Sequence, residues 1–308
     1  MLTLVHLRKD YKNVTAVKDL SFHLDPGDVF GFIGPNGAGK TTTIRICATL
    51  LQPTSGAVYV DGLDVTARPT EVRGIIGYMP DFFGVYDDVM VWEYLDFFAA
   101  AYRIPRPRRQ AAINDVLELT DLTGRRDAYL EELSRGMKQR LCLAKTLLHD
   151  PKVLLLDEPA SGLDPRARIE MKELLKELKA MGKTIFISSH ILPELADFCN
   201  KIGIIEQGEL VVSGDVEEIM RRVQGGKALS IEVDQGTDRA IALLSACPNI
   251  KGVRQEGASI IAEFATDDVD QSQILRLLIE QGLRVKSFSE TRVGLEDIFM
   301  RVTRGIVS

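Results

Sequence analysis

The sequence has few cysteines and only one tryptophan among its 308 residues. Cys47, Cys142, Cys199 and Cys247 are far apart, and none forms a CxxC pair or neighbours a histidine. A zinc site needs closely grouped ligands, and a disulfide framework needs an oxidising compartment and suitably spaced cysteines. The pattern therefore argues against both. We therefore expect reduced thiols in a cytoplasmic chain.

Long apolar runs and an excess of positive charge are also missing. No apolar run approaches the roughly 18 residues of a spanning helix, and the N-terminal stretch "MLTLVHLRKDY" has no basic leader followed by an apolar core. The formal net charge of -6 argues against broad binding to nucleic acid or to an anionic membrane. We expect a soluble, unexported chain that binds no nucleic acid and holds any polyanion through a local motif.

The part of the chain before about residue 220 alternates strand and helix signals. Short segments rich in Val, Ile, Leu and Phe predict strands, at 1–8, 17–24, 28–33, 57–60, 153–156, 184–188, 202–206 and 209–212. Several of these segments are apolar throughout, as parallel strands covered on both faces are. Residues 1–220 are therefore predicted to form an α/β domain, with a helical insertion at about 82–150.

The remainder of the chain predicts a second, smaller domain. Residues 221–227 are polar and contain glycine, which favours a linker. An accessory α+β domain over 228–308 should follow, with strands at 228–233, 250–255, 259–264 and 283–288 and helices at 238–246, 269–281 and near 294–303. Up to residue 288 the order is βαββαβ, which is that of a ferredoxin-like unit.

The stretch "GPNGAGKTT" at 34–42 matches the phosphate-loop pattern G-x-x-x-x-G-K-S/T. It lies between the strand "VFGFI" and the helical "TTIRICATLL", which is the context this motif requires and an ordinary glycine turn does not. In such a loop the glycines let the backbone wrap the phosphates, the lysine reaches the β- and γ-phosphates, and the first threonine supplies a hydroxyl to Mg²⁺. The expected ATP-binding residues are Gly34, Pro35, Asn36, Gly37, Ala38, Gly39, Lys40, Thr41 and Thr42.

An acidic pair follows the apolar strand in "VLLLDEP" at 153–159. Such a pair is usually a solvated strand end, but the phosphate loop in the same chain favours a role in phosphate chemistry. Asp157 is expected to hold the Mg²⁺ shell, and Glu158 to polarise a water aimed at the γ-phosphate.

A second anion-binding feature is predicted at "LSRGMKQRL", residues 133–141. Ser134 stands where a helix N-cap would be, and the apolar spacing after it predicts a helix. The free N–H groups at a helix start suit a phosphate, although the chain already contains a stronger phosphate site.

With these motifs, residues 1 to about 220 resemble the nucleotide-binding subunits of ABC transporters. The resemblance implies a P-loop ATPase with a mixed sheet and a helical insertion that uses ATP and Mg²⁺. "LSRGM" is similar to the family signature LSGGQ, with Arg135 in place of Gly and Met137 in place of Gln. The resemblance implies that Ser134, Arg135, Gly136 and Met137 of one chain close over the γ-phosphate held by the phosphate loop of a second chain.

Further positions match the family one at a time. "SGLD" at 161–164 is similar to the loop that crosses the dimer interface, which implicates Ser161 and Asp164. His190 in "ISSH" resembles the switch histidine that contacts the γ-phosphate, the alternative being a structural hydrogen-bonder at a strand end. Tyr11 resembles the aromatic residue that stacks on adenine, the alternative being a surface or core tyrosine.

Asp81 departs from the family pattern. It stands in "IGYMPDFFG" where the family usually has a glutamine that touches Mg²⁺ or the attacking water and links hydrolysis to the membrane subunit. An aspartate can ligate Mg²⁺ but cannot donate as an amide does. An aromatic-rich stretch follows, comprising Phe82, Phe83, Val85, Tyr86, Trp92, Phe97 and Phe98. Most of these are expected in the core of the helical insertion, and those next to Asp81 in a groove that receives a helix of the membrane subunit.

The implied function is ATP hydrolysis that powers transport by a separate polytopic permease. The ATPase should form a dimer and attach through the permease to the cytoplasmic face of the membrane. The single cassette without a fused membrane span, the "SRGM" signature and the accessory domain ending in "LEDIFMRVT" resemble the ATPase subunits of multidrug, antibiotic or polysaccharide exporters. This resemblance implies an exporter, with an importer as the alternative. A non-transport ABC ATPase acting on ribosomes or DNA is the main alternative, and an ATP sensor without catalysis is a third; the intact Lys40, Asp157, Glu158 and His190 disfavour the sensor.

Overall fold

The computed structural model describes residues 1–81, 84, 88–191, 195, 198–223, 228–264 and 270–291. The chain forms two compact units, Met1–Val216 and Glu217–Ser308. The expected boundary lay at 221–227, whereas helix α8 (Val216–Val223) occupies the first part of that segment. In the described ranges no helix is long and apolar enough to cross a membrane.

The first unit contains a ten-stranded mixed sheet with the order β5-β4-β1-β2-β10-β9-β3-β8-β7-β6. Strands β6, β7, β8, β3 and β9 run parallel, while β1, β2, β4 and β5 pair antiparallel. The strand bounds are β1 Leu2–Tyr11, β2 Val14–Leu24, β3 Val29–Ile33, β4 Ser55–Val60, β5 Leu63–Asp64, β6 Ile76–Met79, β7 Val153–Asp157, β8 Thr184–Ser189, β9 Lys201–Glu206 and β10 Glu209–Asp215. The predicted α/β class is therefore confirmed.

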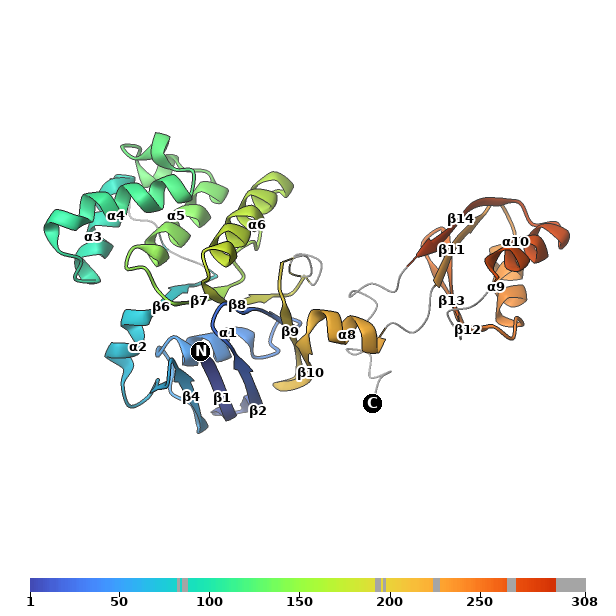
Figure 1. The fold of residues 1–308 in the computed structure, drawn as a ribbon, viewed down its shortest axis with the longest axis horizontal. Coiled ribbons are helices and arrows are strands. Elements are labelled where there is room, and N and C mark those ends of the chain that lie inside the picture. Colours follow the sequence, from blue (N-terminus) through green and yellow to red (C-terminus); the bar gives the residue numbers. More distant parts are fainter. Residues whose placement is uncertain are drawn as a thin grey trace. The chain divides into compact units, whose positions relative to one another are not determined.

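Helix α1 (Lys40–Cys47) lies between the parallel strands and the antiparallel strands of this sheet (Figure 1). Its buried Ile44, Ile46 and Cys47 belong to one core cluster with residues of β1, β2 and β4 and with residues of β3, β7 and β8. A stacked pair, Phe22 of β2 and Phe30 of β3, with ring centroids 4.8 Å apart, joins the two sides of this core. Because α1 is enclosed in this way, its first turn is held firmly at the carboxyl end of β3.

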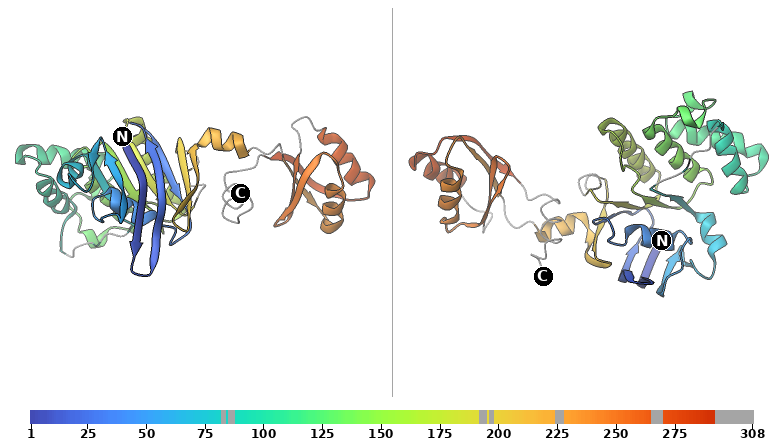
Figure 2. Two further views of the ribbon diagram at one scale, coloured as in Figure 1. Left: turned by 90° about the horizontal axis from the view of Figure 1, so that it is seen from below. Right: turned by 180° about the vertical axis from the view of Figure 1, so that it is seen from behind.

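The expected helical insertion contains α3 (Val91–Ala101), α4 (Arg106–Leu119) and α5 (Arg135–Leu147), with two short 3-10 helices, η1 (Thr123–Arg125) and η2 (Leu130–Glu132), before α5. Helix α2 (Pro69–Ile75) precedes β6, and α6 (Pro165–Ala180) follows β7. Figure 2 shows these helices from two further sides.

Two sequence expectations need correction in this region. The strands β5 and β6 were not predicted, although β6 pairs in parallel with β7 over its whole length. Phe97 was expected in the core of the insertion, but its side chain is 64% exposed on α3. The expected groove at Phe82, Phe83, Val85 and Tyr86 lies outside the described residues.

The second unit has the predicted βαββαβ order. Strands β11 (Ala228–Val233), β12 (Ile250–Glu256), β13 (Ser259–Phe264) and β14 (Val285–Thr291) form an antiparallel sheet in the order β12-β13-β11-β14. Helices α9 (Thr237–Ser245) and α10 (Gln271–Glu280) pack on one face of it (Figures 1 and 2), where Leu229 and Ile231 meet Leu244 and Leu278. The expected final helix near 294–303 lies outside the described residues.

The thiols provide a first prediction about this fold. Cys47, Cys142 and Cys199 are buried, and burial raises the pKa of Cys47 to about 12. Because the thiolate is the reactive form, a colorimetric disulfide reagent at pH 8 should modify only Cys247 rapidly in the native protein and all four thiols in denaturant. A Cys247→Ser variant, the control, should lose the fast phase. A fast phase that survives would contradict the burial of Cys47, Cys142 and Cys199.

Candidate functional site

The phosphate loop connects β3 to α1, and two of its glycines are required by close backbone contacts. Gly39 has a φ of +109°, and a Cβ there would lie 2.4 Å from the carbonyl oxygen of Ala16. A Cβ on Gly34 would lie 2.2 Å from the carbonyl oxygen of Ile205. No other residue fits either position, so β2 and β9 fix the path of the loop.

Lys40 is held inside this loop. Its side chain is 5% exposed, and its Nζ donates to the carbonyl oxygens of Gly34 at 2.6 Å and Pro35 at 3.1 Å. The same Nζ lies 3.3 Å from Oε1 of Glu158. The loop thus carries a fixed ammonium group directly beside a carboxylate of the next functional segment.

Asp157, the last residue of β7, is fully buried and joins the phosphate loop to β8. Its Oδ1 accepts hydrogen bonds from Thr41 Oγ1 at 3.2 Å and from Ser188 Oγ at 2.7 Å. Burial raises the pKa of Asp157, the two hydrogen bonds lower it, and the negative charges of Asp81 and Glu158 raise it further. Its Oδ2 is buried without a hydrogen-bond partner among the described residues.

Glu158 has a left-handed backbone, with φ of +50°, which is uncommon for a residue with a side chain. Its N–H donates to Ser188 Oγ at 3.0 Å, which helps to hold that conformation. Its carboxylate pairs with Lys40 through Oε1 and hydrogen-bonds to Nδ1 of His190 through Oε2. The side chains of Glu158 and His190 are 14% and 40% exposed, so both reach solvent at the edge of the sheet.

These segments meet around a pocket of about 670 Å³. It is lined by Ala16, Asn36, Gly37, Gly39, Lys40, Thr41, Thr42, Asp81, Arg135, Glu158, Ser161 and His190. The pocket therefore brings together much of the predicted phosphate loop, Glu158, His190 and Asp81, while Asp157 lies behind the lining and bonds to Thr41. It combines backbone N–H groups, an ammonium and carboxylates, which is the chemistry that a metal-bound polyphosphate needs.

Several predicted residues lie outside this lining. Tyr11 ends β1 with its side chain 49% exposed, and Lys9 Nζ lies 5.3 Å from the centre of its ring. Among the described lining residues Arg135 is present, whereas Ser134, Gly136 and Met137 are not. Stacking of Tyr11 on a base, and binding of a second chain's phosphate by the start of α5, remain predictions.

Ser134 and Asp164, both singled out from the sequence, act as N-caps of helices. Ser134 Oγ accepts from the N–H of Met137 at 3.3 Å, which confirms the predicted N-cap of α5. Asp164, expected at a dimer interface, caps α6 by accepting from the N–H of Ala167 at 2.9 Å. Such caps typically stabilise a helix by about 1 kcal/mol.

Ser188 is a site residue that sequence analysis missed. Only the position of His190 was singled out in "ISSH", yet Ser188 both donates to Asp157 and accepts from the Glu158 backbone. The reason is the strand register, which places Ser188 directly opposite Asp157. That register cannot be read from the spacing of residues 31 positions apart in the chain.

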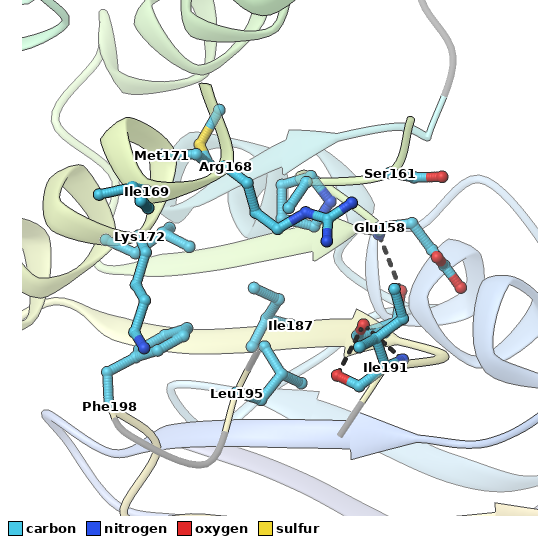
Figure 3. A pocket seen from close by; sticks show the side chains of 15 residues that line it. Glu158, Ser161, Arg168, Ile169, Met171, Lys172, Ile187, Ile191, Leu195 and Phe198 are labelled. Atoms are coloured by element: carbon cyan, nitrogen blue, oxygen red, sulfur yellow. Dashed lines mark hydrogen bonds between the residues drawn. The ribbon is translucent and has the colours of Figure 1, made fainter. Parts of the chain in front are cut away.

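A second cavity, of about 270 Å³, lies between β8 and α6 and shares Glu158 and Ser161 with the first (Figure 3). Ile187, Leu195 and Phe198 give much of its wall an apolar character. It contains no part of the phosphate loop. We therefore place the candidate nucleotide site in the larger pocket.

The larger pocket also suits a magnesium ion. Thr41 Oγ1 and the buried Asp157 Oδ2 offer hard oxygen ligands, and a cation there would offset the cost of burying the Asp157 charge. No group of three or more His, Cys, Asp or Glu side chains that could hold a metal occurs in the described part of the chain. Mg²⁺ does not require one, because it is commonly bound by one or two carboxylates together with substrate phosphates and water.

Comparison with known proteins places this geometry in context. Residues 17–161 match the family described as "ABC transporter", and residues 214–303 match "ATP-binding protein DrrA1-3-like, C-terminal domain". A Nod factor export ATP-binding protein I of Burkholderia pseudomallei is 34% identical over 297 residues, which is 96% of this chain and 95% of that protein. An uncharacterized ABC transporter ATP-binding protein of Bacillus subtilis is 33% identical over 98% of this chain and 99% of its own length.

Solved structures agree with the sequence relatives. An ATP-binding subunit of an ABC transporter superposes with a TM-score of 0.65 at 30% identity, covering 72% of this chain and 92% of that one. A dimeric ATP-binding cassette, MJ0796, bound to ADP and Pi after hydrolysis has a TM-score of 0.64 at 25% identity, covering 70% of this chain and 99% of that one.

Proposed function

The chain belongs to the ATP-binding proteins of ABC transporters, and from this we propose that it hydrolyses ATP to drive export by a separate membrane permease. Members of this family bind ATP and are ATPases. The observation that carries the proposal is the convergence of Lys40, Glu158 and His190 on one pocket built on the phosphate loop, with Asp157 hydrogen-bonded to Thr41 of its lining.

The residues of the pocket would divide the reaction among them. The loop N–H groups and Lys40 bind the β- and γ-phosphates, and a phosphate at Lys40 competes with Glu158 for the ammonium. Glu158 then polarises the attacking water. His190, hydrogen-bonded to Oε2 of Glu158, orients the Glu158 carboxylate and reaches the γ-phosphate. Mg²⁺, held by Thr41 and Asp157 with Asp81 nearby, would neutralise charge on the phosphates. The face of Tyr11 would support adenine.

A second copy of the chain is proposed to complete each site. The start of α5, capped by Ser134, would close over the γ-phosphate bound to the partner's phosphate loop, because free N–H groups at a helix start suit an anion. The dimeric state of the similar cassette MJ0796 supports this arrangement. The loop from Ser161 to Asp164 would then lie at the interface.

Export is proposed because of the relatives and the second unit. The similar protein of Burkholderia pseudomallei is named for export of Nod factor, and it aligns with both units of this chain. The match of residues 214–303 to a DrrA-like C-terminal domain supports the same subgroup. Attachment to the cytoplasmic face of the membrane through the permease follows from this proposal.

Recovery of the partner from membranes tests the proposal. The tagged chain, expressed in its own host and extracted with mild detergent, should carry a polytopic membrane protein identifiable by mass spectrometry. In vesicles containing both proteins, ATP addition should drive transport and the permease should raise ATPase activity.

The Glu158→Gln chain provides the control, since it should recover the same membrane protein but drive no transport. Recovery of ribosomal or DNA-repair proteins in place of a polytopic protein would support the non-transport alternative. Transport toward the side of the membrane that carries the ATPase would support an importer.

A further inference from the structure

We propose that Arg135 is a positioning residue that connects the start of α5 to the Glu158–Asp164 loop of its own chain and thereby couples the two ATP sites of a dimer. This inference rests on the proposed function, in which the start of α5 serves the partner's nucleotide. The usual signature, LSGGQ, has a glycine where this chain has Arg135, and a glycine could not make the side-chain contacts described below.

A short series of contacts leads from Arg135 to the hydrolytic groups. Arg135 Nη2 donates to the carbonyl oxygen of Ser161 at 3.2 Å. The N–H of Ser161 donates to the carbonyl oxygen of Glu158 at 3.0 Å. The Glu158 carboxylate contacts Lys40 and His190. A shift of the guanidinium therefore moves the peptide that positions Glu158.

The loop is shaped to receive the guanidinium. Gly162 has a left-handed φ of +66°, and a Cβ there would lie 2.2 Å from Arg135 Nη2. The guanidinium thus rests directly on the backbone of Gly162. A second contact holds the same two segments together, because a Cβ on Gly136 would lie 2.9 Å from Cβ of Ala167 in the first turn of α6. Arg135 is therefore packed on the Glu158–Asp164 loop, and the next residue, Gly136, on the first turn of the helix that follows it.

Arg135 and Ser134 are therefore expected to lie next to different nucleotides. Arg135 lines the pocket of its own phosphate loop, whereas Ser134 is absent from the described lining and is proposed to meet the partner's phosphate. Because the two are neighbours at a helix start, movement of α5 toward the partner's γ-phosphate carries Arg135 and the loop with it. Occupancy of one site then sets the position of Glu158 in the other.

Mixed dimers can show whether Arg135 acts on the ATP site of its own chain or on that of the partner chain. A Glu158→Gln chain, which should bind ATP but hydrolyse it slowly, is added in large excess, so that turnover comes from mixed dimers in which both sites hold ATP and one site hydrolyses it. In the first arm Arg135→Gln is placed on the chain that keeps Glu158. In the second arm it is placed on the Glu158→Gln chain. The reference mixture carries Arg135 in both chains.

The first arm should lower kcat by about three- to tenfold, the effect of losing one net hydrogen bond, and leave the KM for ATP within about twofold. In the second arm Arg135 belongs to the α5 start that faces the working site, so the loss there should be smaller than in the first arm. Arg135→Lys, which can still donate to Ser161, should restore part of the loss. In homodimers Arg135→Gln should also lower the Hill coefficient for ATP toward 1.

The proposal fails if the loss in the second arm equals or exceeds the loss in the first, or if neither arm loses activity. It also fails if the wild-type Hill coefficient is already 1. These outcomes differ from a failure of the proposed function, in which the wild-type chain would hydrolyse no ATP at all.

Discussion

The Glu158→Gln variant should bind ATP and turn it over about 10²- to 10⁴-fold more slowly than the wild type, which is the usual contribution of a positioned base. Glutamine has the same shape and can keep a hydrogen bond to His190, but it carries no charge with which to polarise water. The loss should therefore appear in kcat, measured by phosphate release, with nucleotide affinity measured separately by equilibrium binding.

Lys40→Ala is the contrasting variant. Its ammonium is fixed by the carbonyl groups of Gly34 and Pro35 and faces the pocket, so its removal should weaken ATP binding itself. Because charge-assisted hydrogen bonds contribute about 1.5–3 kcal/mol, affinity should fall about 10- to 100-fold. Near-normal hydrolysis by Glu158→Gln would remove Glu158 from the role of base, whatever Lys40→Ala does.

A dimer that depends on the γ-phosphate is the second large effect expected. In the slowly hydrolysing Glu158→Gln background, sedimentation should show a dimer with ATP and a monomer with ADP. Adding Ser134→Asp should abolish the dimer, because a carboxylate at the start of α5 would face the partner's γ-phosphate and repel it.

Ser134→Asn is the matched control for this experiment. Both Asp and Asn are good N-cap residues, so either replaces the cap that Ser134 Oγ makes to Met137. The two variants differ mainly in charge, and Asn should keep most of the ATP-dependent dimer. A dimer indifferent to nucleotide and to both substitutions would place the interface elsewhere.

The parts of the site that could be predicted from the sequence depend on residues that are close together in the chain. The phosphate loop is recognisable because its glycines, Lys40 and Thr41 serve one ligand within nine residues, and the strand and helix beside it are apolar in the right periods. The N-cap at Ser134 is likewise decided by three neighbouring residues. Such features need no knowledge of which strands are neighbours.

The parts that were missed depend on contacts between distant segments. Ser188 meets Asp157 only because β7 and β8 pair in one register, and the contact of Arg135 with Ser161 needs the start of α5 to lie against the loop before α6. The short β6 was overlooked because four residues give little periodic signal. Phe97 was misplaced because apolar spacing does not say which side of a helix is left uncovered.

The ten-stranded sheet has one weak seam. In the described strands, β2 and β10 share a single paired position, Asp19 opposite Glu209, whereas neighbouring strands pair over most of their length. Across this seam the stacked rings of Phe22 and Phe30 supply contact without directional hydrogen bonds.

The nucleotide pocket lies across this seam. Ala16, which lines the pocket, belongs to the antiparallel strand β2, whereas Glu158 directly follows the parallel strand β7. Ala16 touches the pocket directly at Gly39. The pocket wall is therefore joined across the seam by side-chain and backbone packing, with Ala16 against Gly39 and Phe22 against Phe30, and not by a continuous ladder of backbone hydrogen bonds.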